Sequence, residues 1–69
     1  MLVDYKGRTL TVGKRVRVEQ DIPSENGMLY KISIVKLDEM NTKTKKVRVT
    51  DSLGKVWWIE PTQVSCSFL

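Results

Sequence analysis

The segment KKVRVTDSLGKVWWIEPTQV (residues 45–64) decides which fold this chain can adopt. Its first half places Val47 and Val49 between charged or polar residues, and alternation with a period of two is typical of a half-buried strand. The DSLG sequence at 51–54 has Asp first and Gly last, as a type I turn favours. The alternation resumes over 55–60. The segment therefore predicts two antiparallel strands joined by a tight turn.

The far end of this predicted hairpin is marked by Pro61, which has no N–H to donate to a strand ladder. PTQV (61–64) then predicts one helical turn, and SCSF (65–68) predicts a short closing strand. Trp57 and Trp58 occupy adjacent strand positions, so their side chains point to opposite faces. We expect one of them in the core and the other at least partly exposed.

Two segments upstream repeat the alternating pattern. KRVRV at 14–18 echoes KKVRV at 45–49, with valines on one face and basic residues on the other. LYKISIVKL at 29–37 also alternates and predicts one strand. One face of this strand would hold Tyr30, Ile32 and Ile34, and the other Lys31, Ser33 and Val35.

The connections between these strands are polar. DIPSENG (21–27) predicts a long first loop, and DEMNTK (38–43) predicts a second. At the start of the chain, LVDYKGRTLTV (2–12) predicts a small hairpin that turns at Lys6 and Gly7. The alternative to an exposed tryptophan is that this hairpin covers the outer tryptophan side chain.

Five or six short strands in 69 residues predict an all-β fold that closes on itself, because an open sheet would leave an apolar face and two edges uncovered. The expected fold is a small five- to six-stranded barrel with one 3₁₀ turn before the last strand. Residues 1–69 would form one domain, with the hairpin at 2–12 and the barrel at 13–68.

The composition favours a binding protein that works in the cytoplasm. Cys66 is the single cysteine, so no disulfide is expected, whereas small secreted domains usually have several. Met1 is not followed by a signal-peptide pattern, and no apolar stretch is long enough to span a membrane. The formal net charge is +4, which suits nucleic acid or an acidic partner.

The order of these elements resembles the SH3-like barrel family. The resemblance rests on VGKRVRV (12–18), on DSLGKVWWIEPTQV (51–64) and on SCSF at the end, and it covers residues 12–68. It implies the barrel architecture, and it implies little about function because this fold carries unrelated activities.

Three branches of that family differ in what they imply. The KOW and chromatin-type branch, which binds nucleic acid, is similar in GKRVRV (13–18), and we favour it, although its closely spaced glycines are absent. Peptide-binding SH3 domains are similar in the acidic loop and in IEPTQV (59–64), but Val64 stands where their groove has an aromatic residue. The small plasmid-encoded dihydrofolate reductase is similar in GKRVRV, but its Val-Gln-Ile-Tyr motif has no counterpart, and this branch is set aside.

Catalysis is not expected from this sequence. The chain has no histidine to act as a general base near neutral pH. One cysteine without histidine makes neither a nucleophile pair nor a zinc site, and no phosphate-binding glycine loop is present. We therefore predict neither an enzyme nor a bound cofactor or metal.

The best hypothesis is a small basic protein that binds DNA or RNA with little sequence specificity. If the valines of the echoing strands fill the core, their basic neighbours must point outward, where phosphates would meet them. An exposed tryptophan would pack on bases or sugars. Basic residues that only keep a strand edge soluble are the alternative reading. The candidate nucleic-acid contacts are Arg15, Arg17, Lys46, Arg48, Lys14, Lys45, Trp57 and Trp58.

The alternative function is a protein-interaction module. Its acidic loop would hold a basic partner, and an apolar contact would come from a tryptophan and a proline. The candidate residues are Glu19, Asp21, Glu25 and Pro61. A very short basic chain would also suit an accessory protein of a bacteriophage or mobile element that modulates a host protein. The oligomeric state stays open.

Overall fold

The alternating segments form strands whose apolar side chains meet in one core. The computed structural model of this chain describes residues 2–25 and 27–66. The two echoing stretches form strand β1 (Arg15–Val18) and strand β5 (Lys46–Thr50). All valines of both strands are fully buried, as predicted. They are Val16, Val18, Val47 and Val49.

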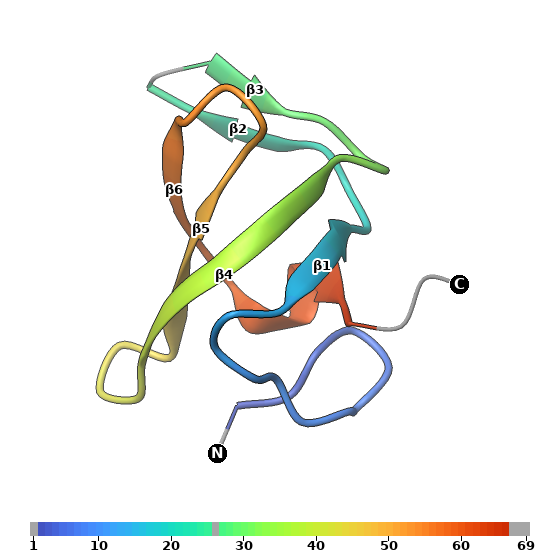
Figure 1. The fold of residues 1–69 in the computed structure, drawn as a ribbon, viewed down its shortest axis with the longest axis vertical. Helices are drawn as coiled ribbons and strands as arrows, with labels where there is room; N and C mark the ends of the chain where they lie inside the picture. The colour runs from blue at the N-terminus through green and yellow to red at the C-terminus, as the bar shows by residue number, and fades with distance from the viewer. Residues whose placement is uncertain (1, 26, 67–69) are drawn as a thin grey trace.

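Five strands form one antiparallel sheet in the order β6–β5–β4–β1–β7 (Figure 1). Its other members are β4 (Ile34–Asn41), β6 (Val56–Ile59) and β7 (Val64–Ser65). A separate hairpin is made by β2 (Ile22–Ser24) and β3 (Gly27–Leu29). The described residues thus contain seven strands, where the sequence predicts five or six.

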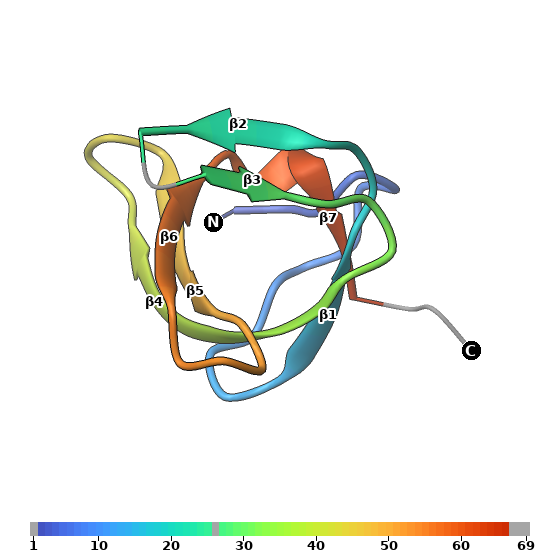
Figure 2. The same ribbon diagram turned by 90° about the horizontal axis from the view of Figure 1, so that it is seen from above.

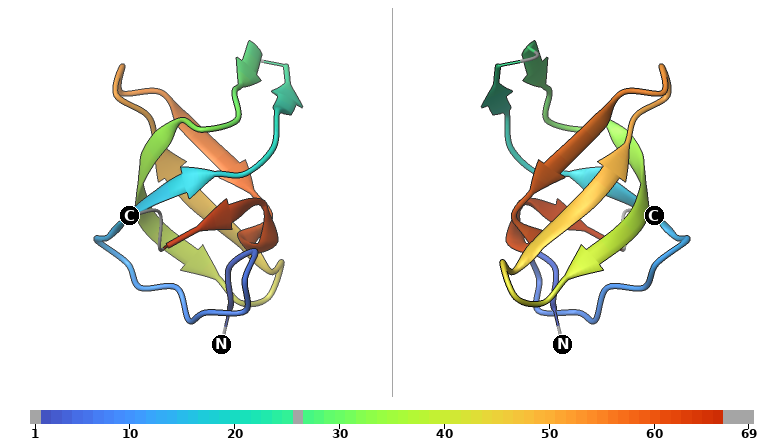
Figure 3. Two further views of the ribbon diagram at one scale, coloured as in Figure 1. Left: turned by 90° about the vertical axis from the view of Figure 1, so that its right-hand side faces the viewer. Right: turned by 90° about the vertical axis from the view of Figure 1, so that its left-hand side faces the viewer.

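The sheet curves around the core when it is seen from above (Figure 2). The β2–β3 hairpin lies at one end of the molecule and the N-terminal segment at the other (Figure 3). In the part of the chain that the structure describes, β6 and β7 are the edges of the sheet and do not pair with each other. The strand pairing establishes an all-β fold with a curved sheet.

The segment 29–37 is not one strand, and this prediction is wrong. Leu29 ends β3, and the chain turns before β4 begins, with the Ser33 N–H donating to the Tyr30 carbonyl at 3.2 Å. Ile32 has a φ of +78°, in the left-handed region, which is incompatible with an extended strand. The exposed large apolar side chains of this segment are Tyr30, Ile32 and Ile34, and the buried ones are Leu29, Val35 and Leu37.

Two predicted loops contain strand residues. Within 21–27, Ile22 is buried and pairs with Leu29, so the first loop is a hairpin that contributes to the core. Within 38–43, β4 continues to Asn41, with an irregularity in its pairing with β5. Polar composition failed as a loop signal here because the outer face of a half-buried strand is polar too.

The tight turn predicted at 51–54 is confirmed. The Gly54 N–H donates to the Asp51 carbonyl at 3.1 Å, and Gly54 has a φ of +83°, which glycine adopts readily. The Asp51 carboxylate accepts the backbone N–H groups of Leu53 and Lys55, both at 2.9 Å. The hydrogen bond from Lys55 is the main cause that lowers the pKa of Asp51 below its usual value. This aspartate organises the whole β5–β6 connection.

The helical turn after β6 is also confirmed, as the 3₁₀ helix η1 (Pro61–Gln63). Pro61 stands at its start, where a missing N–H does no harm. The Glu60 N–H donates to the Gln63 side chain at 2.8 Å, so Gln63 caps the turn. The closing strand β7 begins one residue before the predicted range of 65–68. Residues 67 and 68 of that prediction lie outside the described part of the chain.

The N-terminal hairpin forms around a buried aspartate that the sequence reading missed. Val3 bridges to Thr9, and the Asp4 carboxylate accepts the backbone N–H groups of Lys6 at 2.9 Å and Arg8 at 2.8 Å. The same carboxylate accepts the backbone N–H of Cys66 at 2.9 Å and its thiol at 3.0 Å. Asp4 therefore ties the hairpin to the residue that follows β7.

The core is continuous across both sheets. It contains Leu10, Val16, Val18, Ile22, Leu29, Val35, Leu37, Val47, Val49, Trp57, Ile59 and Val64. Leu10 brings the N-terminal segment into this core. No helix among the described residues is long and apolar enough to cross a membrane.

Candidate functional site

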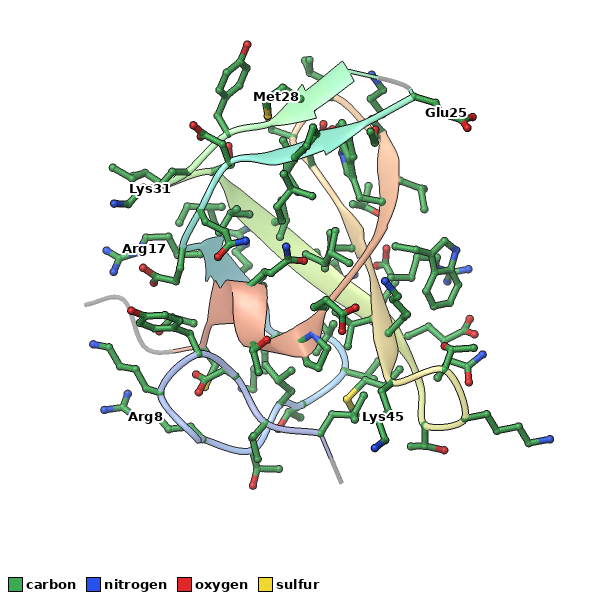
Figure 4. The ribbon with its side chains drawn as sticks, turned by 180° about the vertical axis from the view of Figure 1, so that it is seen from behind. Arg8, Arg17, Glu25, Met28, Lys31 and Lys45 are labelled. Carbon is green, nitrogen blue, oxygen red and sulfur yellow. The ribbon has the colours of Figure 1, made fainter. Side chains whose placement is uncertain are left out.

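The two echoing strands lie in one sheet but are not neighbours, because β4 separates them. Arg15 of β1 lies opposite Lys36 of β4, so the like-charge pairing occurs between these two residues. Figure 4 shows Arg8, Arg17 and Lys31 along one side of the molecule and Lys45 away from them. The basic residues of the two strands therefore form two groups.

The basic residues of β1 are poorly placed as a shared phosphate site. Arg17 is half-buried, and its Nε and its terminal nitrogen both contact Glu19 Oε2 at 3.1 Å. The Glu19 side chain is only 13% exposed, which shields this ion pair from solvent. Arg15 is exposed, and Lys14 is exposed one residue before the strand begins. The Arg17 guanidinium is therefore occupied by Glu19 and is poorly available to a phosphate.

The two tryptophans of β6 divide as the alternation predicts. Trp57 is buried; its Nε1–H donates to Asp51 Oδ2 at 3.3 Å, and Lys55 Nζ lies 5.0 Å from the centre of its ring. Trp58 is 48% exposed. The alternative in which the 2–12 hairpin covers the outer tryptophan is therefore wrong.

Trp58 lies among the basic residues of β5. Its strand partner is Arg48, and a hollow of about 410 Å³ beside it is lined by Trp58, Lys46, Thr44 and Asn41. The Asn41 side chain accepts the N–H groups of Lys43 and Thr44 and so shapes the β4–β5 turn. Lys43 and Lys45 are exposed in the adjoining turn between β4 and β5. We call the surface made by Trp58, Lys46 and Arg48, together with these two turn lysines, the Trp58 face.

The acidic neighbours of the Trp58 face form only solvent-exposed ion pairs with its cations. Lys46 Nζ lies 2.9 Å from Glu60 Oε1, and an Arg48 terminal nitrogen lies 3.4 Å from Glu39 Oε1. All four side chains are between 39% and 51% exposed. Such solvent-exposed ion pairs contribute about 0–1 kcal/mol. Both cations can therefore exchange a carboxylate for another anion at little energetic cost.

The four residues of the predicted protein-binding site are not equally available. Glu19 is paired with Arg17, and Pro61, the first residue of η1, is buried. Asp21 is exposed, and its carboxylate accepts the Lys31 N–H at 2.8 Å. Glu25 is exposed beyond the end of β2, far from Arg17 in Figure 4. The structure does not join them into one acidic and apolar surface.

The acidic side chains and the thiol of Cys66 are candidates for metal binding and for nucleophilic chemistry. In residues 2–25 and 27–66, no three side chains among Cys, Asp and Glu group closely enough to hold a metal ion. The thiol of Cys66 donates to the Asp4 carboxylate, and this bond, burial and the negative charge of Asp4 together raise its pKa. A raised pKa leaves less thiolate, which is the nucleophilic form.

Sequence reasoning missed Lys43 and Asn41 in this site. The density of lysines at 43–46 was the available signal, since four positive charges fall within 43–48. A polar connection was predicted at 38–43, but the turn lies at 42–45. The Asn41 side chain that shapes this turn was not predicted.

The chain was also compared with known proteins. No protein family, no curated protein and no solved structure compared with this chain matches it significantly.

Proposed function

We propose that this protein binds nucleic acid through the Trp58 face. The observation that carries the proposal is the half-exposed Trp58, which lies opposite Arg48 and beside Lys46. A base or sugar would stack on the indole ring, and phosphates would contact the lysines of the β4–β5 turn. Of the residues predicted from sequence, the proposal uses Lys45, Lys46, Arg48 and Trp58.

The energetics favour this use of the surface. Stacking of one base on an aromatic side chain contributes about 1–3 kcal/mol and tolerates any sequence. Phosphate contacts add affinity by releasing counterions, and they position the chain without reading its bases. Because the Trp58 face has four cations and only two acidic neighbours, its net charge stays positive. The expected ligand is single-stranded DNA or RNA of any sequence.

We further propose that the fold is an SH3-like barrel of the kind that binds nucleic acid. The succession of elements supports this proposal: a first strand, a long connection, two strands, the tight turn at 51–54, then β6, η1 and the short β7. An experimental structure that shows a different succession of pairings around the core would contradict it. Such a protein would act in the cytoplasm, where its single thiol stays reduced.

The test is a titration of labelled DNA and RNA, single-stranded and duplex, followed by fluorescence anisotropy at low and at physiological salt. We expect micromolar or tighter binding that weakens as salt rises, since phosphates carry much of the affinity. Because Trp57 is buried, quenching of the exposed Trp58 would report stacking independently. Absence of binding even at low salt would overturn the proposal.

A pair of charge-matched variants locates the site. Lys45→Glu with Arg48→Glu changes the Trp58 face, whereas Arg8→Glu with Lys31→Glu makes the same change in net charge elsewhere (Figure 4). We expect the first variant to lose binding by at least about tenfold and the second to bind nearly as the parent does. Equal losses in both variants would mean that net charge alone, and no particular face, attracts the ligand.

A further inference from the structure

A second surface lies at the end of the molecule that carries the β2–β3 hairpin and the β5–β6 turn (Figure 1 and Figure 3). Two adjoining hollows of about 350 and 400 Å³ share Ile34, Asp51 and Ser52. One extends to Met28 and Tyr30, and the other to Arg15 and Lys36. We call this continuous depression the hairpin groove. Neither of its two hollows is lined by any of the five residues of the Trp58 face.

The hairpin groove exposes several large apolar side chains. Leu53 lies in the β5–β6 turn, and its side chain is 91% exposed. The turn uses the backbone N–H of Leu53, which donates to the Asp51 carboxylate, and does not use its side chain. Tyr30 is 65% exposed and lies in the same hollow. Met28 and Ile34, which complete the apolar lining, are 39% and 40% exposed. Contiguous exposed apolar patches of this kind mark interaction sites.

The turn beside the groove retains isoleucine where the backbone disfavours it. Ile32 has a φ of +78°, a conformation that Gly or Asn adopts with less strain than a β-branched residue. Its side chain is 66% exposed, so burial in the core does not compensate for the strain. Strain of this sort that the fold does not require is a sign of function.

The other half of the groove is cationic. Arg15 and Lys36 lie directly opposite each other on β1 and β4, where like charges destabilise the pairing. Among the described residues, neither of these side chains forms an ion pair, unlike Arg17, Lys46 and Arg48. The nearby Asp51 carboxylate is already used by the N–H groups of the turn and of Trp57. The two cations thus face the groove without a counter-ion from that residue.

We propose that the hairpin groove binds an acidic, extended segment of a protein partner. Large apolar side chains of the segment would cover Leu53, Tyr30 and Ile34. Its carboxylates would pair with Arg15 and Lys36. Apart from Tyr30, the exposed apolar side chains of the groove are the aliphatic Met28, Ile34 and Leu53. They favour a peptide over nucleic acid, since bases stack on aromatic rings and not on leucine or isoleucine. The surface goes beyond the proposed nucleic-acid function and does not depend on it.

The test is a titration of ¹⁵N-labelled protein with short synthetic peptides that alternate Asp or Glu with Leu or Phe, followed by amide chemical shifts. We expect shifts at Tyr30, Ile34, Ser52 and Leu53, and none at Trp58. A control peptide with Lys in place of every acidic residue should cause none of these shifts. The absence of shifts at millimolar acidic peptide, or equal shifts with the basic control, would overturn the proposal.

Two variants on the groove and one outside it sharpen the test. Leu53→Ser, which keeps the backbone N–H of the turn, and Arg15→Glu with Lys36→Glu should each weaken peptide binding by about tenfold or more. Trp58→Ala should leave peptide binding unchanged while weakening oligonucleotide binding, so that the two functions fail separately. If an oligonucleotide shifts the groove amides and the acidic peptide does not, the groove belongs to a nucleic-acid surface and the peptide proposal is wrong.

Discussion

The echoing strands β1 and β5 share one sequence pattern and differ in their surroundings. Each buries two valines completely. On β1, Arg17 is held by Glu19, whereas on β5, Arg48 lies opposite the exposed Trp58. Alternation therefore decides which side chains enter the core. Neighbouring residues decide what the outer face can bind.

The largest effect should come from a charge in the core of either strand. Val16→Asp and Val47→Asp each place a carboxylate without a partner at a fully buried position, which costs several kcal/mol. A core of this size supplies only about 3–5 kcal/mol in total. We expect both variants to be unfolded by circular dichroism, while Arg15→Asp on the outer face stays folded. A folded Val47→Asp beside an unfolded Val16→Asp would show that the two strands do not support one core equally.

The next largest effect is a loss of stability in acid, which should affect the part of the molecule near β1 before the part near β5. Burial raises the pKa of Asp4, but hydrogen bonds from Cys66, Arg8 and Lys6 outweigh it and lower the pKa from its usual 3.8 to about 2. A lowered pKa adds stability that is present above about pH 4 and is lost as the pH falls towards 2. We expect about 2 kcal/mol from this group.

Urea unfolding of the parent and of Asp4→Asn across this range measures that contribution. The variant should be less stable at neutral pH, and the difference should shrink as the pH approaches 2. Amide exchange should accelerate first in β7, next to β1, and later in β5, which has no comparable clamp. A difference that does not change with pH would show that the charge of Asp4 is not what stabilises the hairpin.

A smaller effect should appear in nucleic-acid affinity, when the outer face around Trp58 is compared with the outer face of β1. Trp58→Ala should weaken binding to single-stranded nucleic acid by about tenfold through lost stacking, with stability changed by less than about 0.5 kcal/mol. Arg17→Ala, on the echoing strand, should leave the affinity almost unchanged because its guanidinium is held by Glu19. Anisotropy titrations of both variants under identical salt conditions make the comparison. A larger loss in Arg17→Ala would place the binding face on β1.

The smallest effect compares the ion pairs of the two strands. Arg17→Ala should destabilise the fold by about 1 kcal/mol, since its pair is partly shielded, and Arg48→Ala by about 0.5 kcal/mol or less. Thermal or urea unfolding at low and high salt measures both. We expect high salt to weaken the Arg48 pair more than the shielded Arg17 pair, so the difference in destabilisation between the two variants should persist. A difference that narrows in high salt would show that the Arg17 pair is as accessible to solvent as the Arg48 pair.

Patterns local in the sequence predicted local features well. The valines of the two echoing stretches, the turn at 51–54 and the helical turn at Pro61 are all where the sequence placed them. The prediction of one strand over 29–37 failed because alternation continues through a turn in which Ile32 adopts a positive φ. Period alone cannot detect a backbone reversal when the alternation of apolar and polar residues in the sequence continues through it.

The candidate site was predicted only in part. Adjacent tryptophans had to face opposite ways, so one exposed ring was expected, and basic residues had to lie outside. Which tryptophan was exposed depended on the direction in which β6 faces the core. Asp4 was missed because its four donors include the backbone of Cys66, which is 62 residues away in the chain.

The sequence by itself determined that this chain folds as strands, with valines inward and basic residues outward, because side-chain direction in a strand follows from a period of two. Tertiary structure alone decided that β4 separates the echoing strands, that Arg17 meets Glu19, and that Arg15 meets Lys36. The order of strands in a sheet is set by how distant segments share one core, and no local pattern encodes it. For that reason one repeated sequence motif yields two strands whose outward side chains have different neighbours within the chain.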